Sequence, residues 1–342
     1  MLKGMLKKAI GRGTTPLPYD MFVPGRFDLE ARSARSLERI YHKGQQFSWD
    51  GRGVLDALFE EHGAPKLDAK RRDALGRLFA IIMWGELAAW KVSTQLAEAL
   101  EPLEAKMAAT SQAFDEARHF YVMHDYLVAL GAMPDRVDPW TERLLSDVMG
   151  ADHLAKKLLG MQLMVEPVAL SIFHVVRKSN IEPVLSALMP YYERDEARHV
   201  ALGVKYMPTL IRQMNIRQRA ELFAFQAWLL SLEVGGNVAI MRDLETLGLP
   251  PRMLADQGRM KQTRALRLMM DELGIDSSVP MTVLERYAAT LMEATVNEPG
   301  ESTRDRFMRV LRTARYGLAE LDIGVEPDIN PEQTPYIQPA AG

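Results

Sequence analysis

The sequence contains no cysteine among its 342 residues. This absence excludes disulfide bonds, thiolate metal sites and cysteine nucleophiles, and it is typical of a protein in a reducing cytoplasm. Any metal ion must therefore be bound through nitrogen and oxygen atoms. The chain also lacks a strong excess of charge of one sign. Its formal net charge is −3, so the composition gives no indication of a nucleic-acid partner.

The sequence also has few signals of β-structure or of membrane-spanning segments. We find no alternating apolar and polar run that is typical of a strand. No uncharged apolar stretch is long enough to span a bilayer, and the first residues lack the apolar core of a signal peptide. With 47% hydrophobic and 25% charged residues, the composition is that of a globular protein. We therefore expect an all-α, cytoplasmic protein.

The first twelve residues form a distinct basic segment. Four positive charges, Lys3, Lys7, Lys8 and Arg12, occur there without an acidic residue, and apolar residues recur at helical spacing. Such a segment can lie on an anionic membrane surface as an amphipathic helix. It can also pack on its own domain or fray, which is common at chain termini. We favour the second interpretation and keep peripheral membrane contact through residues 1–12 as the alternative.

Hydrophobic periodicity and helix breakers divide the chain into three parts. Residues 1–27 contain the basic segment and an irregular lead-in, residues 28–320 form a helical domain, and residues 321–342 form an extended tail. The predicted helices are Leu29–His42, Gly53–His62, Leu67–Leu100, Glu104–Leu130, Pro139–Met149, His153–Ser179, Pro183–Met214 and Ile216–Leu247, with two or three more in residues 252–319. The four long patterns in residues 67–214 form two pairs joined by a crossover, which predicts a four-helix bundle with one long connection.

The same five residues, Asp-Glu-Ala-Arg-His, occur twice in the chain. The first copy begins at Asp115 and the second at Asp195, an offset of 80 residues. Residues three apart on a helix lie on one face, so the glutamate and the histidine of each copy project together. The two pairs are Glu116 with His119 and Glu196 with His199. A charged helix face stabilised by local ion pairs explains one such copy but not two, so we interpret the repeat as a duplicated set of metal ligands.

Two further glutamates recur at the same offset. Glu86 interrupts the apolar sequence IIMWGELAAW, and Glu166 interrupts MQLMVEPVAL. A carboxylate without a partner in such surroundings costs several kcal/mol, so both are expected to have one. Each glutamate lies 30 residues before the glutamate of the following repeat. One glutamate from each of two helices, together with Glu-x-x-His from each of two others, defines the di-iron or di-manganese carboxylate bundle.

The other residues of the repeat are suited to hold the two imidazoles. A histidine that binds a metal needs an acceptor for its second ring N–H, which fixes the tautomer and the orientation of the ring. The expected pairs across the bundle are Asp195 with His119 and Asp115 with His199. Arg118 and Arg198 then neutralise the two aspartates.

These motifs resemble those of the ferritin-like superfamily of non-haem di-iron carboxylate proteins. The Asp-Glu-x-Arg-His form is similar to that of the hydroxylase subunit of bacterial multicomponent monooxygenases and of acyl-carrier-protein desaturases. The similarity covers about residues 67–214 and implies a ferritin-like bundle with flanking helices. It implies six metal ligands, of which the glutamates also take part in catalysis. These are Glu86, Glu116, His119, Glu166, Glu196 and His199.

The sequence departs from each familiar branch of that superfamily. Met123 occupies the position of the radical tyrosine of ribonucleotide reductase small subunits, and Tyr192 that of the third histidine of arylamine N-oxygenases. Monooxygenases and desaturases usually carry a threonine three or four residues after the third glutamate, where this chain has Ala169 and Leu170. The resemblance therefore does not select one branch.

Pro167 directly follows Glu166. A proline within a helix removes one backbone hydrogen bond and clashes with the carbonyl four residues earlier. The resulting distortion either lets Glu166 change its coordination or only shapes the packing, and both interpretations stay open. Apolar residues one helical step from the ligands are expected to be core, and some of them to line a substrate cavity. They are Met83, Phe114, Phe120, Met123, Leu163, Leu170 and Phe173.

The resemblance implies an oxygen-activating oxidoreductase that hydroxylates, desaturates or otherwise oxidises an apolar organic substrate. The implied cofactors are two Fe ions, with Mn/Fe as an alternative, and O₂ is the co-substrate. The implied partner is an electron-donor protein such as a ferredoxin or a reductase, and a homodimer is one expected assembly. Two alternatives remain: a ferroxidase or peroxide-scavenging protein without an organic substrate, and a ligand-binding oxidase with a Mn/Fe centre. The length of the chain favours an enzyme over a storage ferritin, which is much shorter.

Overall fold

The computed structural model describes residues 31–274, 278–295 and 301–316. The basic segment, the lead-in, the extended tail and both expected domain boundaries lie outside these ranges. Within them all regular structure is helical, as predicted. The helices are α3 (Ala31–Gln46), α4 (Gly51–His62), α5 (Ala69–Ala99), α6 (Leu103–Leu130), α7 (Pro139–Met149), α8 (Leu154–Leu158), the π-helix η2 (Leu159–Val165), α9 (Glu166–Ser179), α10 (Pro183–Gln213), α11 (Ile216–Leu247), α12 (Pro251–Leu273), α13 (Ser278–Thr295) and α14 (Thr303–Tyr316).

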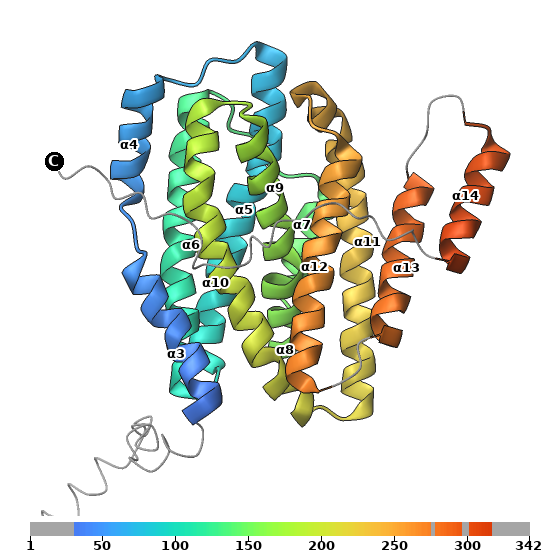
Figure 1. Cartoon of the computed structure of the whole chain (residues 1–342). Coiled ribbons are helices and arrows are strands. Elements are labelled where there is room, and N and C mark those ends of the chain that lie inside the picture. Colours follow the sequence, from blue (N-terminus) through green and yellow to red (C-terminus); the bar gives the residue numbers. More distant parts are fainter. Residues whose placement is uncertain (1–30, 275–277, 296–300, 317–342) are drawn as a thin grey trace, which may run out of the picture.

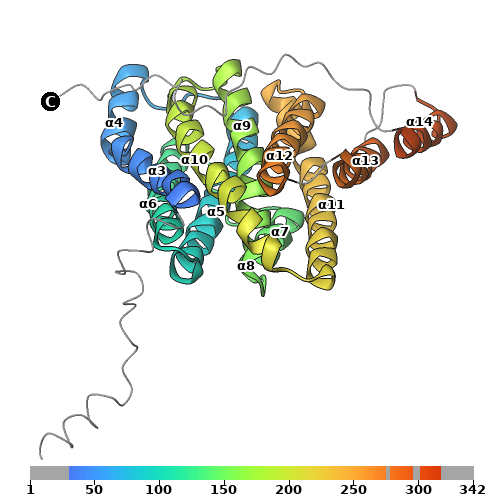
Figure 2. The same ribbon diagram turned by 60° about the horizontal axis from the view of Figure 1, so that its bottom comes forward.

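Two helix pairs form the central bundle. α5 packs along α6, α9 packs along α10, and α6 contacts α10 between the pairs. The connection from α6 to α9 runs through α7 and α8, which accounts for the long crossover predicted from the sequence. α3 and α4 cover the outer side of α6 and α10, while α11 and α12 cover the opposite side of the bundle (Figures 1 and 2).

Capping residues set the ends of the bundle helices. The Asp68 side chain accepts hydrogen bonds from two backbone amides of the first turn of α5. Gly131, with φ of 70°, ends α6 in the left-handed conformation that glycine adopts without steric cost. The buried Glu182 carboxylate accepts from two backbone amides at the start of α10 and from the Tyr126 hydroxyl of α6. These caps hold the starts and ends of the helices that carry the repeated motifs.

The core of the bundle divides into two apolar clusters with a polar layer between them. On α5, Phe79 and Met83 belong to one cluster and Val92 to the other, and Glu86 lies between them in sequence. On α10, Tyr192 belongs to the first cluster and Val200 to the second. The Glu-x-x-His pair of α10 falls in this interval. The repeated motif is therefore held in the interior, between layers that exclude water.

Two described helical segments are long and apolar enough to cross a membrane. They are Leu154–Ser179, with 78% of its most apolar window buried in the fold, and Ile216–Leu247, with 39% buried. Glu166 interrupts the first segment and Glu233 interrupts the second. Both segments therefore contain charged residues, which agrees with the sequence analysis, where no uncharged stretch of this length was found. The first segment is a core element of the bundle. The second leaves one face exposed, with Phe223, Trp228 and Val238 among the exposed side chains.

Candidate metal centre

All six predicted ligands meet in the middle of the bundle. Glu86 comes from α5, Glu166 from the start of α9, and one Glu-x-x-His pair each from α6 and α10. Their side chains form two overlapping groups in which the candidate ligand atoms lie within 4.8 Å of one another. The first group, here the His119 position, is Glu86, Glu116, His119 and Glu196. The second group, here the His199 position, is Glu116, Glu166, Glu196 and His199. Glu116 and Glu196 are shared, which is the arrangement of two bridging carboxylates.

Both imidazoles turn the same nitrogen toward the carboxylates. His119 Nδ1 lies 3.1 Å from a Glu196 oxygen and 3.5 Å from oxygens of Glu86 and Glu116. His199 Nδ1 lies 3.0 Å from Glu116 and 2.9 Å from Glu196. An Nδ1 lone pair directed into a cluster of carboxylate oxygens is suited to bind a metal ion.

The opposite nitrogen of each ring faces an aspartate across the bundle. His119 Nε2 lies 3.1 Å from Asp195 Oδ2, and His199 Nε2 lies 3.4 Å from Asp115 Oδ2. These are the two pairs expected from the sequence. A neutral ring that carries its proton on Nε2 donates to the aspartate and leaves Nδ1 free to bind a cation. The aspartates therefore select the tautomer that metal binding requires.

Arginines balance the charge of the two aspartates. Arg118 contacts both Asp115 and Asp195, and so does Arg198. Arg194 lies 3.6 Å from Asp195 as a third cation. Arg118 and Arg198 alone match the charges of Asp115 and Asp195, and Arg194 adds one further positive charge. When all four glutamates are deprotonated they carry a charge of −4, which two divalent cations would balance.

The geometry fits a dinuclear metal centre. Glu116 Oε2, His119 Nδ1 and Glu196 Oε1 are buried and make no hydrogen bond within the described part of the chain. Buried polar atoms without partners are rare because each costs free energy. All three belong to residues of the His119 position, where a metal ion would satisfy them together. The donor set of carboxylates and imidazoles suits iron, manganese or zinc.

Burial and neighbouring charges shift the pKa values of these groups strongly. Burial, together with the negative charge of Glu196, raises the pKa of Glu86 and Glu166 well above the usual value of a glutamate. Burial lowers the pKa of His119 and His199, but the surrounding carboxylates outweigh it and raise both well above the usual value. The cluster therefore holds protons tightly. A divalent cation competes with those protons for the same atoms, so its binding releases protons.

The backbone is distorted immediately before Glu166. The seven residues of η2 form a π-helix, and the Glu166 N–H donates to the carbonyl of Met161, five residues earlier. Pro167 has no N–H to donate, so the regular α-helical pattern cannot continue through this turn. The distortion expected at Pro167 is thus present, on its N-terminal side. It lies next to Glu166, a candidate ligand of the His199 position.

Two glutamines that the sequence analysis did not identify contact the carboxylates. Gln112 Nε2 donates to Glu116 Oε1 at 2.9 Å and to Glu166 Oε1 at 3.1 Å. Gln162, on the π-helix, donates from Nε2 to the side-chain Oε1 of Gln112 at 3.2 Å. Gln112 lies one helical turn before Glu116, so its place on the ligand face was the signal that could have identified it. The two amides border the His199 position.

Aromatic side chains border the His119 position instead. The Tyr192 ring stacks on His119 with centroids 4.3 Å apart, and its hydroxyl donates to the His119 carbonyl at 2.7 Å. Trp49, in the turn between α3 and α4, donates from Nε1 to Asp195 Oδ2 at 2.7 Å. No sequence signal pointed to Trp49, because it lies 146 residues from its partner. These rings hold His119 and Asp195 in place.

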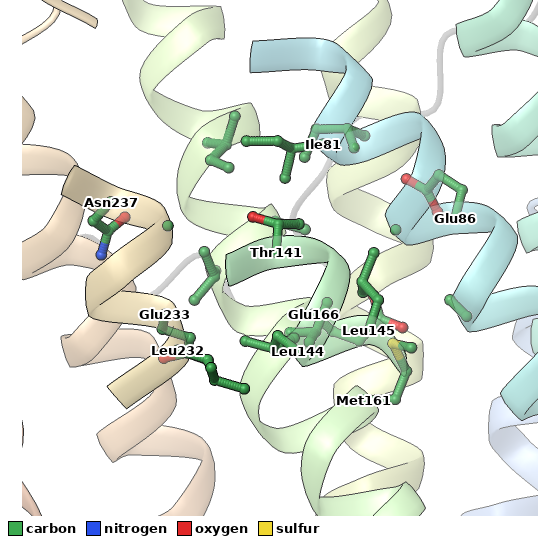
Figure 3. A pocket seen from close by; sticks show the side chains of 18 of the residues that line it. Ile81, Glu86, Thr141, Leu144, Leu145, Met161, Glu166, Leu232, Glu233 and Asn237 are labelled. Carbon is green, nitrogen blue, oxygen red and sulfur yellow. The ribbon is translucent and has the colours of Figure 1, made fainter. Parts of the chain in front are cut away.

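An apolar cavity of about 110 Å³ reaches the centre from the side of α7 and α11. Glu86 and Glu166 form part of its wall, with Ile81, Leu144 and Met161 among the apolar lining residues (Figure 3). None of the seven apolar residues expected near the ligands lines this cavity. Most of the seven are buried in the core, as expected from the sequence. Phe114 is an exception, with 62% of its surface exposed. The expectation that some of them line a cavity does not hold for this one, because its wall is formed by other residues of α5 and α9 together with α7 and α11.

Comparison with known proteins supports the fold. No protein-family model matches this sequence, and no curated protein gives a significant match. One solved structure that matches is an R2-like ligand-binding oxidase from Sulfolobus acidocaldarius, determined by micro-crystal electron diffraction. The sequences are 19% identical, the TM-score is 0.50, and the match covers 70% of this chain and 92% of the other. The fold is a ferritin-like helical bundle. Helices α11 to α14 extend it on one side (Figure 1).

Proposed function

We propose that this protein is an oxygen-activating, non-haem di-iron oxidoreductase that acts on an apolar organic substrate. The observation that carries the proposal is the apolar cavity whose wall includes Glu86 and Glu166, one glutamate from each of the two metal positions. A storage protein has no need for such a cavity beside its metal ligands. Two ferrous ions held by these residues would supply the electrons that activate O₂, and O₂ would be the oxidant of the substrate.

The residues of the chain have distinct tasks in this proposal. Glu116 and Glu196 would be shared by the two positions, and the four glutamates together would balance the charge of two divalent ions. His119 and His199 fix each position through rings that Asp195 and Asp115 orient. The apolar clusters on both sides of the polar layer exclude water, which strengthens electrostatic interactions and limits side reactions.

Glu166 differs from the other candidate ligands because it lies at a distorted turn. The π-helix before it and Pro167 after it interrupt the regular hydrogen bonding that would fix the backbone. Gln112 donates to Glu166, so a movement of this carboxylate exchanges one hydrogen bond for a metal contact. We therefore propose Glu166 as the carboxylate that changes its coordination. Hydroxylation and desaturation of the substrate are both compatible with this site. We propose that an electron-donor protein in the cytoplasm, such as a ferredoxin or a reductase, returns two electrons to the metal centre after each reaction.

The proposal is tested by loading the full-length protein with ferrous iron without oxygen and then adding O₂. We expect about two irons per chain, one oxygen-dependent optical change per centre, and renewed reaction only after chemical re-reduction. Continuous oxidation of many irons per chain would instead support a ferroxidase.

A ligand-binding oxidase with a Mn/Fe centre is the second candidate. One solved structure with this fold is named an R2-like ligand-binding oxidase, which favours this alternative over storage. Loading with equal amounts of Mn²⁺ and Fe²⁺ distinguishes the two. Bound metal in a reproducible one-to-one ratio would support the Mn/Fe centre, whereas iron at both positions would support the first proposal.

A further inference from the structure

A single carboxyl group stands at the side of the cavity that is formed by α11. Glu233 and Asn237 lie one helical turn apart on α11, and Figure 3 shows them on one side of the cavity, with Glu86 of α5 on the other. Thr141 of α7 lines the same cavity. The remaining wall is mostly aliphatic. Glu233 and Asn237 also line a second cavity of about 40 Å³ toward α12 and α13. Glu233 thus borders two cavities.

Glu233 is held in place by an amide but has no ion-pair partner within the described residues. Gln262 of α12 donates from Nε2 to both Glu233 oxygens, at 2.8 and 2.9 Å. The same amide contacts the Met164 carbonyl at 3.0 Å, so its position is fixed. Burial raises the pKa of Glu233 to about 8, and the hydrogen bond from Gln262 offsets this only in part. The protein therefore keeps a carboxyl group in an apolar wall without supplying a counter-charge.

The charge pattern of the cavity excludes an anionic ligand at this end. The described lining residues of the larger cavity include three carboxyl groups and no lysine, arginine or histidine. Arg259 lines only the smaller cavity, where it lies 3.7 Å from Asp256. An anionic group beside Glu233 would have no basic partner among the described lining residues. A ligand that donates hydrogen bonds and carries positive charge would instead be attracted by the carboxyl groups of the cavity wall.

The number of acceptors matches one chemical group. A primary ammonium has three N–H donors and no acceptor. The Glu233 carboxylate, the Asn237 side-chain oxygen and the Thr141 hydroxyl are three acceptors on the wall of one cavity. A neutral alcohol would use fewer of them and would form no charge-assisted hydrogen bond with Glu233.

We infer that the cavity binds an apolar primary amine, with its ammonium group at Glu233 and its hydrocarbon part directed toward Glu86 and Glu166. Cavities of roughly 150 Å³ bind a benzene ring, so the space of about 110 Å³ suits a short alkyl chain or a small ring. That such an amine is a substrate rests on the proposed function, since oxidation requires the metal centre. Its binding at Glu233 does not.

The test is calorimetric titration of the full-length protein, iron-loaded and free of oxygen, with n-hexylamine, n-hexanol and n-hexanoate. These probes have the same chain length and differ in the charge of the head group. We expect hexylamine to bind at least about 10-fold more tightly than hexanol, because a charge-assisted hydrogen bond is worth about 1.5–3 kcal/mol. The Glu233→Gln variant should bind hexylamine no more tightly than hexanol. Glu245→Gln, at an exposed position of the same helix, is the matched control and should bind like the unchanged protein.

Three results would overturn the inference. They are equal binding of hexylamine and hexanol, undiminished hexylamine binding by Glu233→Gln, and tighter binding of hexanoate than of hexylamine. These outcomes are separate from those of the oxygen experiment. A protein that loads two irons and reacts once with O₂ but ignores hexylamine retains the proposed function and loses this inference. A protein that binds hexylamine at Glu233 but takes up no metal retains this inference and loses the proposed function.

Discussion

The two metal positions share the same ligand types but differ in their surroundings. Around His119 the neighbours are aromatic: Tyr192 stacks on the ring, and Trp49 donates to its aspartate. Around His199 the neighbours are amides, with Gln112 bonded to two glutamates and Gln162 bonded to Gln112. Gln112 and Tyr192 are themselves 80 residues apart, so they occupy the same place in the repeat.

This difference separates two properties of the centre. The duplicated ligands determine how many ions bind and how their charge is balanced. The neighbouring residues differ between the two copies and make the two positions unequal. The His119 position has a ring stacked on its imidazole. The His199 position has a distorted helix and an amide that competes with a metal ion for a carboxylate. We expect ligand changes to alter metal stoichiometry and neighbour changes to alter one position at a time.

The largest effect is expected from the shared glutamates. Glu116→Ala or Glu196→Ala should abolish dinuclear loading, because each side chain belongs to both positions. Glu86→Ala or Glu166→Ala should leave about one ion per chain, since about two are expected with all six ligands. The measurement is metal content by mass spectrometry after anaerobic ferrous loading and desalting. Full loading of either shared-glutamate variant would contradict the assignment, provided that circular dichroism shows unchanged helicity.

The next effect concerns the aspartates that orient the imidazoles. Asp115→Asn and Asp195→Asn should each weaken iron binding by roughly 10–100-fold, the usual range for a group that holds a metal ligand in place. Competition with a chelator of known affinity measures this. Asp115→Asn should act on the His199 position and Asp195→Asn on the His119 position. If neither variant changes the affinity for iron, the two aspartates form only buried ion pairs and do not orient metal ligands.

Removal of the Gln112 amide should affect one position only. Gln112→Leu leaves Glu116 and Glu166 without their common donor, and we expect affinity at the His199 position to fall about 10-fold. Stepwise titration with ferrous iron should show one weakened and one unchanged binding event. Gln213→Leu, at an exposed position of α10, is the control. Two equally weakened events would show that the amide acts on the whole centre.

The smallest effect is expected at the equivalent residue of the second copy. Tyr192→Phe keeps the ring that stacks on His119 and removes only the hydroxyl that donates to the His119 carbonyl. The free energy of unfolding in urea should fall by about 1 kcal/mol, the usual contribution of one such hydrogen bond. Iron affinity should stay within about threefold, because the stacked ring still holds His119. A loss of affinity as large as that of Asp195→Asn would show that the hydroxyl positions the ligand.

Much of the fold could be predicted because local signals set it. The start of α7 at Pro139 and the end of α11 at Leu247 agree with the sequence prediction, since Asp138 caps the first and Gly248 ends the second. The convergence of the six predicted ligands followed from two facts visible in sequence. These are helical spacing within each motif and the improbability of a glutamate without a partner in an apolar helix.

The rest depended on contacts that sequence spacing does not encode. Trp49 reaches Asp195 from a turn outside the bundle, and Gln112 looked like an ordinary helical glutamine. The cavity faces α11, whose packing against α5 and α7 could not be deduced from the bundle pattern. Glu233 was missed although it interrupts the apolar sequence WLLSLEVGG. The reasoning that identified Glu86 applied to it equally.

The π-helix before Glu166 also affects how the two halves of the chain should be aligned. A π-helical turn accommodates one residue more than the α-helix that it interrupts. α5 has no such insertion, so residues after the π-helix correspond at an offset of 80, whereas those before it correspond at about 79. An ungapped comparison of the two halves is therefore out of register upstream of Leu159. A one-residue gap placed in η2 should recover internal similarity there, and the same gap belongs in any alignment of this chain with bundles that lack the insertion.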